Sequence, residues 1–130
     1  MPLPTWLTLA ALLTGCASRS QAEEPLPDPD SVRERIVATL DEAQRLDRDG
    51  RDTEARAAWR RAHVTFETAL EPQLREVLPD REVAITEYQF ARIRSEIDQA
   101  RGRPAPVARK LGERLDTQVS AVQTAREQAP

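Results

Sequence analysis

Apolar residues recur at intervals of three and four along four stretches of the chain, and this spacing most restricts its fold. Such spacing places the apolar side chains along one side of an α-helix. The first stretch, residues 31–50, carries its stripe at Val32, Ile36, Leu40, Ala43 and Leu46. No stretch alternates apolar and polar residues with the period of two expected of a half-buried strand. The pattern therefore predicts an all-α chain.

Glycine and proline residues separate this first helix from three further ones. Gly50 is placed to end the first helix, Pro79 marks the turn into the third, and Gly102 is placed to end the third. Pro104 and Pro106 open the fourth. The three later stripes consist of Ala55, Ala58, Trp59, Ala62, Phe66, Ala69, Leu70 and Leu74; of Val83, Phe90, Ile93, Ile97 and Ala100; and of Ala108, Leu111, Leu115, Val119 and Val122. Four such helices with short turns predict an antiparallel up-down-up-down four-helix bundle over residues 31–128.

Two local patterns predict the details of the helix ends. Ser31 and Glu34 have the spacing of a capping box, so we expect them to begin the first helix. The second helix is expected to begin at about Asp52. Pro72 falls late in that helix and lacks a backbone donor, which predicts a kink or a restart near Glu71.

The chain ahead of the helices divides into two parts. Residues 1–15 carry no charged side chain, and their apolar run is much shorter than the roughly 20 residues that cross a bilayer. A short apolar run followed by small residues is typical of a removable signal peptide. Residues 16–30 contain alternating prolines, which favour an extended backbone, so we interpret them as a flexible tether.

The single cysteine of the chain, Cys16, ends the run Leu13-Thr14-Gly15-Cys16. This run resembles the lipobox of bacterial lipoproteins, in which the thiol receives a lipid and the chain is cut before it. The resemblance implies a membrane anchor that holds the protein on the periplasmic face. The residue directly after the cysteine is Ala17 and not an aspartate. In the lipoproteins that the run resembles, this implies that the protein is anchored in the outer rather than the inner membrane. Residues 1–5 depart from the usual pattern because they contain no lysine or arginine.

The charged and reactive residues exclude several classes of function. The chain has 19 basic and 22 acidic residues and a net charge of -3, which argues against nucleic-acid binding. With one histidine, one cysteine and no glycine-rich phosphate loop, no conventional catalytic triad or nucleotide site can be assembled. We therefore expect a protein that is not an enzyme, and any metal site must rely on carboxylates.

One row of side chains fits such a metal site. His63, Glu67 and Glu71 follow one another at intervals of four, which places them along one side of the second helix. Glu87 and Arg94 occupy a flank of the third helix. Carboxylates from two helices with one imidazole could hold iron, manganese or a similar ion. The alternative is that these charges are solvated faces, or that Glu87 and Arg94 bridge to neighbouring helices.

A second candidate site is apolar. Ile85 and Tyr88 fall on the side of the third helix that faces away from its stripe. An exposed apolar pair can mark a site for a partner protein. The alternative is that this helix is covered on two sides.

Two runs also resemble a known family. They are Ala58-Trp59-Arg60-Arg61-Ala62-His63-Val64-Thr65-Phe66-Glu67, and Ile85-Thr86-Glu87-Tyr88-Gln89-Phe90-Ala91-Arg92-Ile93-Arg94. Over about residues 35–125 the chain is similar to the periplasmic helical domain of bacterial high-affinity iron permeases. The resemblance implies a helical module near an iron-uptake system, with Glu67, Glu71 and Glu87 at its acidic positions. Because the chain contains no permease segment, we expect it not to transport iron itself.

Together these features give one leading hypothesis and one alternative. The leading hypothesis is a lipid-anchored periplasmic bundle that binds a metal ion or a partner such as a permease. The alternative is a structural or adaptor lipoprotein that docks another envelope protein through its helix faces.

Overall fold

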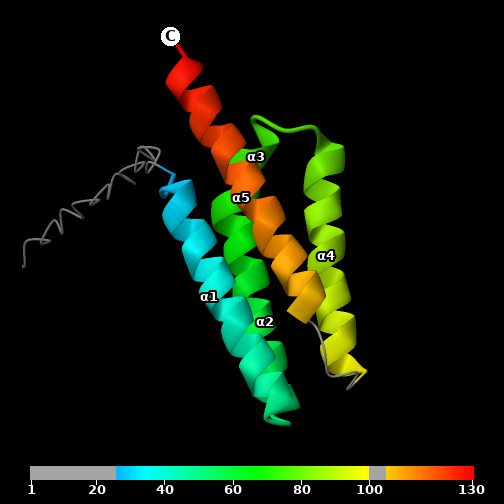
Figure 1. Ribbon diagram of the computed structural model, residues 1–130. Coiled ribbons are helices and arrows are strands. Elements are labelled where there is room, and N and C mark those ends of the chain that lie inside the picture. Colours follow the sequence, from blue (N-terminus) through cyan, green and yellow to red (C-terminus); the bar gives the residue numbers. More distant parts are fainter. Residues whose placement is uncertain (1–25, 100–104) are drawn as a thin grey trace, which may run out of the picture.

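The computed structural model describes residues 26–99 and 105–130, and all regular secondary structure in these ranges is helical (Figure 1). The signal segment 1–15, Cys16 and most of the tether lie outside the described residues, as do Ala100, Gly102 and Pro104. The helical elements are α1 (Pro29–Arg48), α2 (Asp52–Thr65), η1 (Phe66–Leu70), α3 (Glu71–Arg75), α4 (Asp80–Asp98) and α5 (Ala105–Gln128). No helix within the described ranges is both long and apolar enough to span a bilayer.

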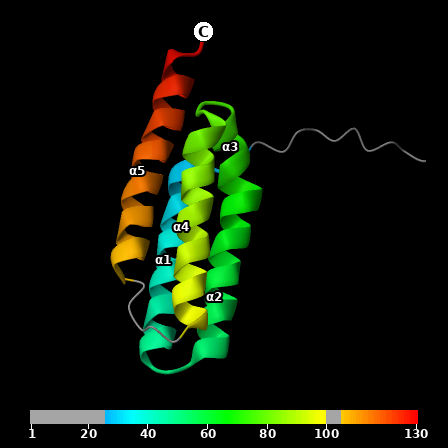
Figure 2. The same cartoon turned by 90° about the vertical axis from the view of Figure 1, so that its right-hand side faces the viewer.

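The order of the elements gives four rods. These rods lie side by side in both views (Figures 1 and 2). η1 and α3 continue α2 directly, so these three elements make up one of the rods. Helix α1 packs against both α2 and α5. Helix α4 also packs against both α2 and α5. The rods therefore meet at four lines of contact. We call the contact between α2 and α4 the α2–α4 seam, and the contact between α1 and α5 the α1–α5 seam.

The first helix begins earlier than the sequence predicted, and with a different cap. Asp28 is the N-cap, and its carboxylate accepts hydrogen bonds from the backbone N–H of Ser31 at 3.0 Å and from the Ser31 hydroxyl at 2.9 Å. These hydrogen bonds, the backbone one first, lower the pKa of the Asp28 carboxyl. Pro29 occupies the first helical turn, where a missing donor costs nothing. The predicted Ser31–Glu34 capping box is therefore wrong, and the tether ends two residues sooner.

The predicted turn between the first two helices is confirmed. Gly50 has a φ of 73°, in the left-handed region that glycine adopts without steric cost, and its N–H bonds to the carbonyl of Asp47 at 3.0 Å. The second helix begins at Asp52, as expected.

Pro72 interrupts the second helix, as its missing N–H predicts, and the helical turn before it is wider than an α-helical turn. The residues before it, Phe66–Leu70, form a π-helical turn, and the N–H of Glu71 bonds to the carbonyl of Phe66, five residues back. A new α-helix then starts at Glu71 with Pro72 in its first turn. The restart near Glu71 is thus confirmed. The wider turn also changes which side of the rod the later residues face.

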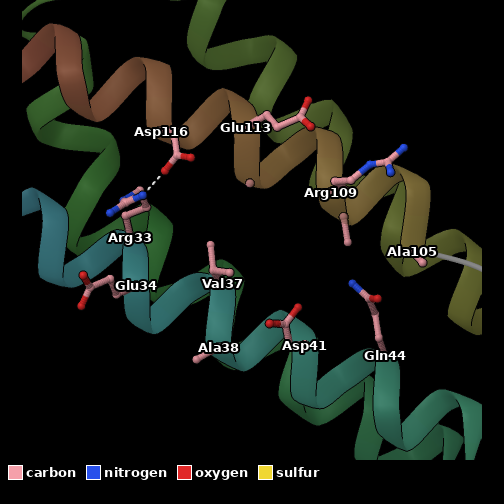
Figure 3. A pocket seen from close by; sticks show the side chains of 12 residues that line it. Arg33, Glu34, Val37, Ala38, Asp41, Gln44, Ala105, Arg109, Glu113 and Asp116 are labelled. Atoms are coloured by element: carbon pink, nitrogen blue, oxygen red, sulfur yellow. Dashed lines mark hydrogen bonds and ion pairs between the residues drawn. The ribbon is translucent and has the colours of Figure 1, made fainter.

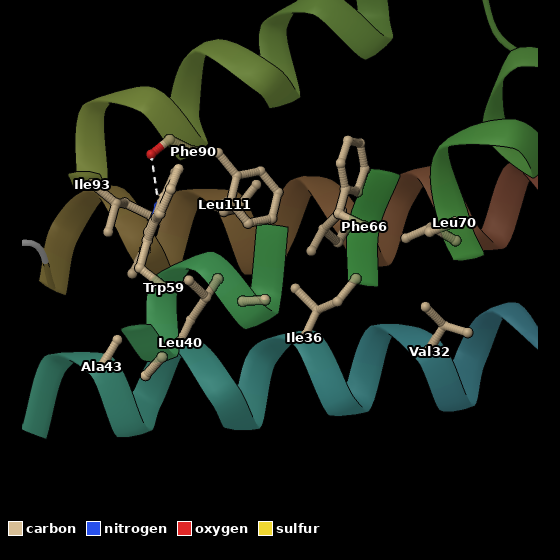
Figure 4. Close-up of a cluster of buried hydrophobic side chains, with 14 of the residues drawn as sticks. Val32, Ile36, Leu40, Ala43, Trp59, Phe66, Leu70, Phe90, Ile93 and Leu111 are labelled. Carbon is tan, nitrogen blue, oxygen red and sulfur yellow. Dashed lines mark hydrogen bonds between the residues drawn. The ribbon is translucent and has the colours of Figure 1, made fainter. Parts of the chain in front are cut away.

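The interior is a continuous cluster of aliphatic and aromatic side chains, and it matches the predicted stripes (Figure 4). Phe66 and Phe90 are its largest fully buried members. Of the predicted stripe residues within the described ranges, all are buried except Ala69, which is half-buried against the cluster. Large buried side chains each contribute about 1.5–3 kcal/mol, so this cluster is the main source of stability.

Four buried polar side chains were not predicted: Asp47, Gln73, Thr86 and Gln118. Gln73 donates to the carbonyls of Pro27 at 2.9 Å and Ala69 at 2.8 Å, and it accepts from Arg126 at 2.5 Å. Thr86 donates to Gln118 at 3.0 Å, linking α4 to α5. Asp47 differs, because one of its carboxylate oxygens is buried with no partner among the described residues. Burial, and secondarily the charge of Asp52, raises the pKa of the Asp47 carboxyl.

Candidate metal centre

The α2–α4 seam brings together one imidazole and two carboxylates from residues that the sequence singled out. Nε2 of His63 lies 2.7 Å from a carboxylate oxygen of Glu87 and 3.3 Å from one of Glu67. His63 and Glu67 are one helical turn apart in sequence, on α2 and in the adjoining η1, whereas Glu87 comes from α4. Glu87 and His63 are 24 residues apart in sequence, so only the packing of the two helices makes this contact.

Aromatic rings hold the imidazole on its other sides. The ring of Trp59 stacks on that of His63 with centroids 5.0 Å apart and 30° between the ring planes. The ring of Phe90 lies at the same centroid distance, 5.0 Å, tilted by 41°. The Trp59 N–H donates to the backbone carbonyl of Phe90 at 2.9 Å, which ties this ring to α4. The imidazole is therefore oriented by packing as well as by its carboxylate partners.

The site is partly exposed to solvent. The side chain of His63 is 20% exposed, that of Glu87 31% and that of Glu67 46%. Exposure rises from the imidazole to Glu67, so the two carboxylates are more accessible than the ring nitrogen. A hydrated ion could reach the carboxylates first and then the nitrogen.

The separations of the three groups suit a small metal ion. One ligand atom from each residue can be chosen so that all three lie within 4.8 Å of one another. Two ligand atoms at the usual bond length of about 2.1 Å lie at most about 4.2 Å apart across an ion. An adjustment of up to about 0.6 Å would therefore bring the widest pair of atoms to opposite positions on one ion. One nitrogen and two carboxylate oxygens leave further coordination positions for water or for a ligand.

Without an ion, the same atoms make a hydrogen bond. An ionised carboxylate only accepts, so in this arrangement an Nε2–H of His63 donates to Glu87 across the 2.7 Å contact. An ion bound at Nε2 must replace this proton. The geometry accordingly fits two uses, a hydrogen-bonded link between helices and a metal ligand set.

Glu71, the fourth predicted ligand, does not belong to this group. Its carboxylate accepts from Arg75 at 2.6 and 2.8 Å, and this hydrogen bond is the main cause that raises the pKa of the Arg75 guanidinium. The physical reason is the π-helical turn between Glu67 and Glu71. A wider turn breaks the regular spacing of four on which the sequence prediction depended.

The remaining predicted residues do not belong to the group of three ligands. Arg94 does not contact Glu87; its guanidinium lies over the Trp59 ring, 5.5 Å from the centroid, and pairs with Asp98 at 3.7 Å. Tyr88 is 62% exposed, and Ile85 is half-buried. Sequence reasoning did not assign a role to Trp59 at the site. The sequence feature that could have indicated such a role is the spacing of four residues between Trp59 and His63. On one helix this spacing places the two side chains next to each other.

Comparison with known proteins adds nothing to this geometry. The chain matches no protein-family model, no curated protein and no solved structure.

Proposed function

We propose that this protein is a lipid-anchored periplasmic four-helix bundle that binds a metal ion at His63, Glu67 and Glu87. The observation that carries the proposal is the convergence of these three side chains from two helices onto one accessible point. Helical bundles commonly build metal sites from side chains on facing helices. The packing of α1 against α2 and of α4 against α5 supports an up-down-up-down topology.

Iron is the ion that we propose first, with manganese as a close alternative. Imidazole suits iron, zinc, copper and nickel, and carboxylates add a preference for harder ions. One imidazole with two carboxylates favours Fe²⁺ or Mn²⁺ over ions that require thiolates. The similarity of the two sequence runs to periplasmic domains of iron permeases supports the same choice. The proposed role is to bind iron in the service of an uptake system, without catalysis.

The anchor is the second part of the proposal. A lipid on Cys16 would hold the protein on the periplasmic face of the outer membrane, with residues 17–28 as the tether. Incorporation of a fatty-acid probe into the wild-type chain, but not into a Cys16→Ser chain, tests this directly. Recovery of unlabelled protein in the cytosolic fraction would contradict it.

Metal titration of the full-length protein tests the site. We expect saturable binding of Fe²⁺ under anaerobic conditions, or of Mn²⁺, by calorimetry. The variants His63→Ala and Glu87→Ala should each weaken binding by at least about tenfold, because each removes a direct ligand. Because Trp59 stacks on His63, a paramagnetic ion there should also quench Trp59 emission. In the uncleaved chain a Trp6→Phe background leaves Trp59 as the only tryptophan.

Glu71→Ala is the matched control, because Glu71 lies on the same rod and its carboxylate is taken by Arg75. This variant should bind the ion as the wild type does. Circular dichroism checks that each variant remains folded. Absence of heat with iron, manganese, zinc and copper ions would refute the metal proposal, as would equal losses in Glu71→Ala and Glu87→Ala.

The alternative function is that of an adaptor that docks another envelope protein. The observation that favours it is the exposure of Tyr88, the most exposed of the large hydrophobic side chains in the described ranges. A photoreactive residue at position 88 should then crosslink one discrete envelope protein in intact cells. Crosslinking to many proteins in proportion to their abundance would contradict the alternative.

A further inference from the structure

The α1–α5 seam, formed by a different pair of helices from the candidate metal centre, contains a groove (Figure 3). Its volume is about 510 Å³. Small and apolar residues form part of its lining, among them Val37 and Ala38 from α1, and Ala108 and Gly112 from α5. A Cβ atom added at Gly112 would meet no other heavy atom within 4 Å, so the space beside this residue is open.

The dimensions of the groove define what can enter it. It runs from Arg33 to Gln44 on α1 and from Ala105 to Asp116 on α5, so it is about 16 Å long, or three helical turns. Its volume over that length gives a cross-section of roughly 30 Å². A helix with its side chains is about 10–12 Å wide and does not fit inside. One row of side chains from such a helix does fit.

The groove is bordered by more acidic than basic groups. The carboxylates of Glu34, Asp41 and Glu113 make no ion pair with the described residues, whereas Asp116 is paired with Arg33. Arg109 is the one guanidinium along the groove without such a pair in the described ranges. A segment that complements this border therefore carries mostly basic residues.

The spacing of the acidic residues favours a helical partner. Glu34 and Asp41 are seven residues apart on α1, which places them about 10.5 Å apart along one face. Basic residues at positions i and i+7 of a helix lying alongside α1 have the same separation. Paired helices use this arrangement of charges beside an apolar row, as do amphipathic helices bound in grooves.

We propose that the α1–α5 groove docks an amphipathic helix of another protein, with small or aliphatic side chains in the groove and basic residues beside Glu34 and Asp41. This site is independent of metal binding, because it shares no residue with the candidate metal centre. Loss of one site should leave the other intact, so the two proposals fail separately.

A designed peptide tests the proposal on the full-length protein. The probe is a fluorescein-labelled, lactam-bridged helix of about 18 residues, with leucine and alanine at positions i, i+4, i+7 and i+11 and lysines seven residues apart on the adjacent face. A second peptide has glutamate in place of each lysine. Fluorescence anisotropy should show saturable binding of the lysine peptide, and at least about tenfold weaker binding of the glutamate peptide.

Variants of the protein locate the binding. Gly112→Leu places a side chain in the open space of the groove and should weaken binding at least about tenfold, whereas Gly112→Ala should not. Asp41→Lys should weaken binding, and Glu127→Lys, an equal charge reversal away from the groove, should not. Circular dichroism should be unchanged in all four, because these positions are exposed or open.

Several outcomes would overturn the proposal. They include no saturable binding up to about 1 mM peptide, equal affinity for the two peptides, and wild-type affinity in Gly112→Leu. Self-association that Gly112→Leu abolishes would identify a second copy of this chain as the occupant instead. Displacement of the peptide by micromolar spermidine would identify a small linear polyamine.

Discussion

The α2–α4 and α1–α5 seams follow from the same amphipathic pattern, but they differ in the size of the side chains that fill them. The α2–α4 seam and the adjoining η1 are packed by rings, with Phe66 of η1 and Phe90 at a centroid distance of 5.1 Å and His63 beside Phe90. Ala38, Ala108 and Gly112 are among the residues that line the α1–α5 seam, where a groove of about 510 Å³ remains. Periodicity decides which side of a helix is buried, and side-chain volume decides how completely a seam closes.

The difference also separates the two proposed sites. A closed seam fixes the rotamers of the side chains at its edge. The rings of Trp59 and Phe90, for example, hold the ring of His63 in place. A metal site requires ligands that are fixed in this way. An open seam leaves room for side chains supplied by another molecule. The two sites are therefore consequences of packing on the two sides of one small bundle.

The largest expected effect is the loss of a ring from the closed seam. Phe90→Ala removes a fully buried side chain that contacts both Phe66 and His63, and should lower the free energy of unfolding by about 3–5 kcal/mol. Urea unfolding followed by circular dichroism measures this. Tyr88→Ala, two positions away and exposed, should change stability by less than about 0.5 kcal/mol. A similar cost for both variants would show that the seam is not packed as described.

Two substitutions that enlarge a side chain compare the stability of the packed interior with that of the open seam. Ala62→Leu adds volume at a fully buried position of α2 and should cost about 1–3 kcal/mol. Gly112→Leu adds volume where a new Cβ meets no atom within 4 Å. Since leucine also favours a helix over glycine by almost 1 kcal/mol, this variant should be as stable as the wild type or more stable. Destabilisation by Gly112→Leu would mean that the groove closes in solution. Thermal unfolding of both variants under one set of conditions decides between these outcomes.

Much of the fold could be predicted because helical periodicity is local. The stripe positions in all four rods, the turn at Gly50 and the restart near Glu71 follow from residues close in sequence. The N-cap could not be assigned with the same certainty. Asp28 and Ser31 both have capping side chains, and the choice of Asp28 depends on Pro29 fitting the first turn. The buried Gln73 depends on partners at Pro27 and Arg126, which are distant in sequence.

The candidate metal centre was predictable only in part. His63 and Glu67 follow from a spacing of four within one helix, whereas the contact with Glu87 depends on how α4 lies against α2. Glu71 illustrates the opposite case, because a local spacing of four failed when Pro72 widened the preceding turn. The groove has no periodic signature. It depends on which small residues of α1 and α5 meet across a seam, and only the packed structure gives that.

The smallest expected effect concerns the polar link across the open seam. Arg33 pairs with Asp116 of α5 and also with Asp30 of its own helix, at 2.6 Å. The side chain of Asp116 is 58% exposed, and Arg33 still has Asp30 as an ion-pair partner when Asp116 is replaced. A double-mutant cycle of Arg33→Ala and Asp116→Ala should therefore give a coupling of about 0.2–1 kcal/mol, and this coupling should decrease as salt is raised. A coupling above about 2 kcal/mol that does not change with salt would contradict this expectation. It would mean that the ion pair is shielded from water and that the open seam is as tightly packed as the closed one.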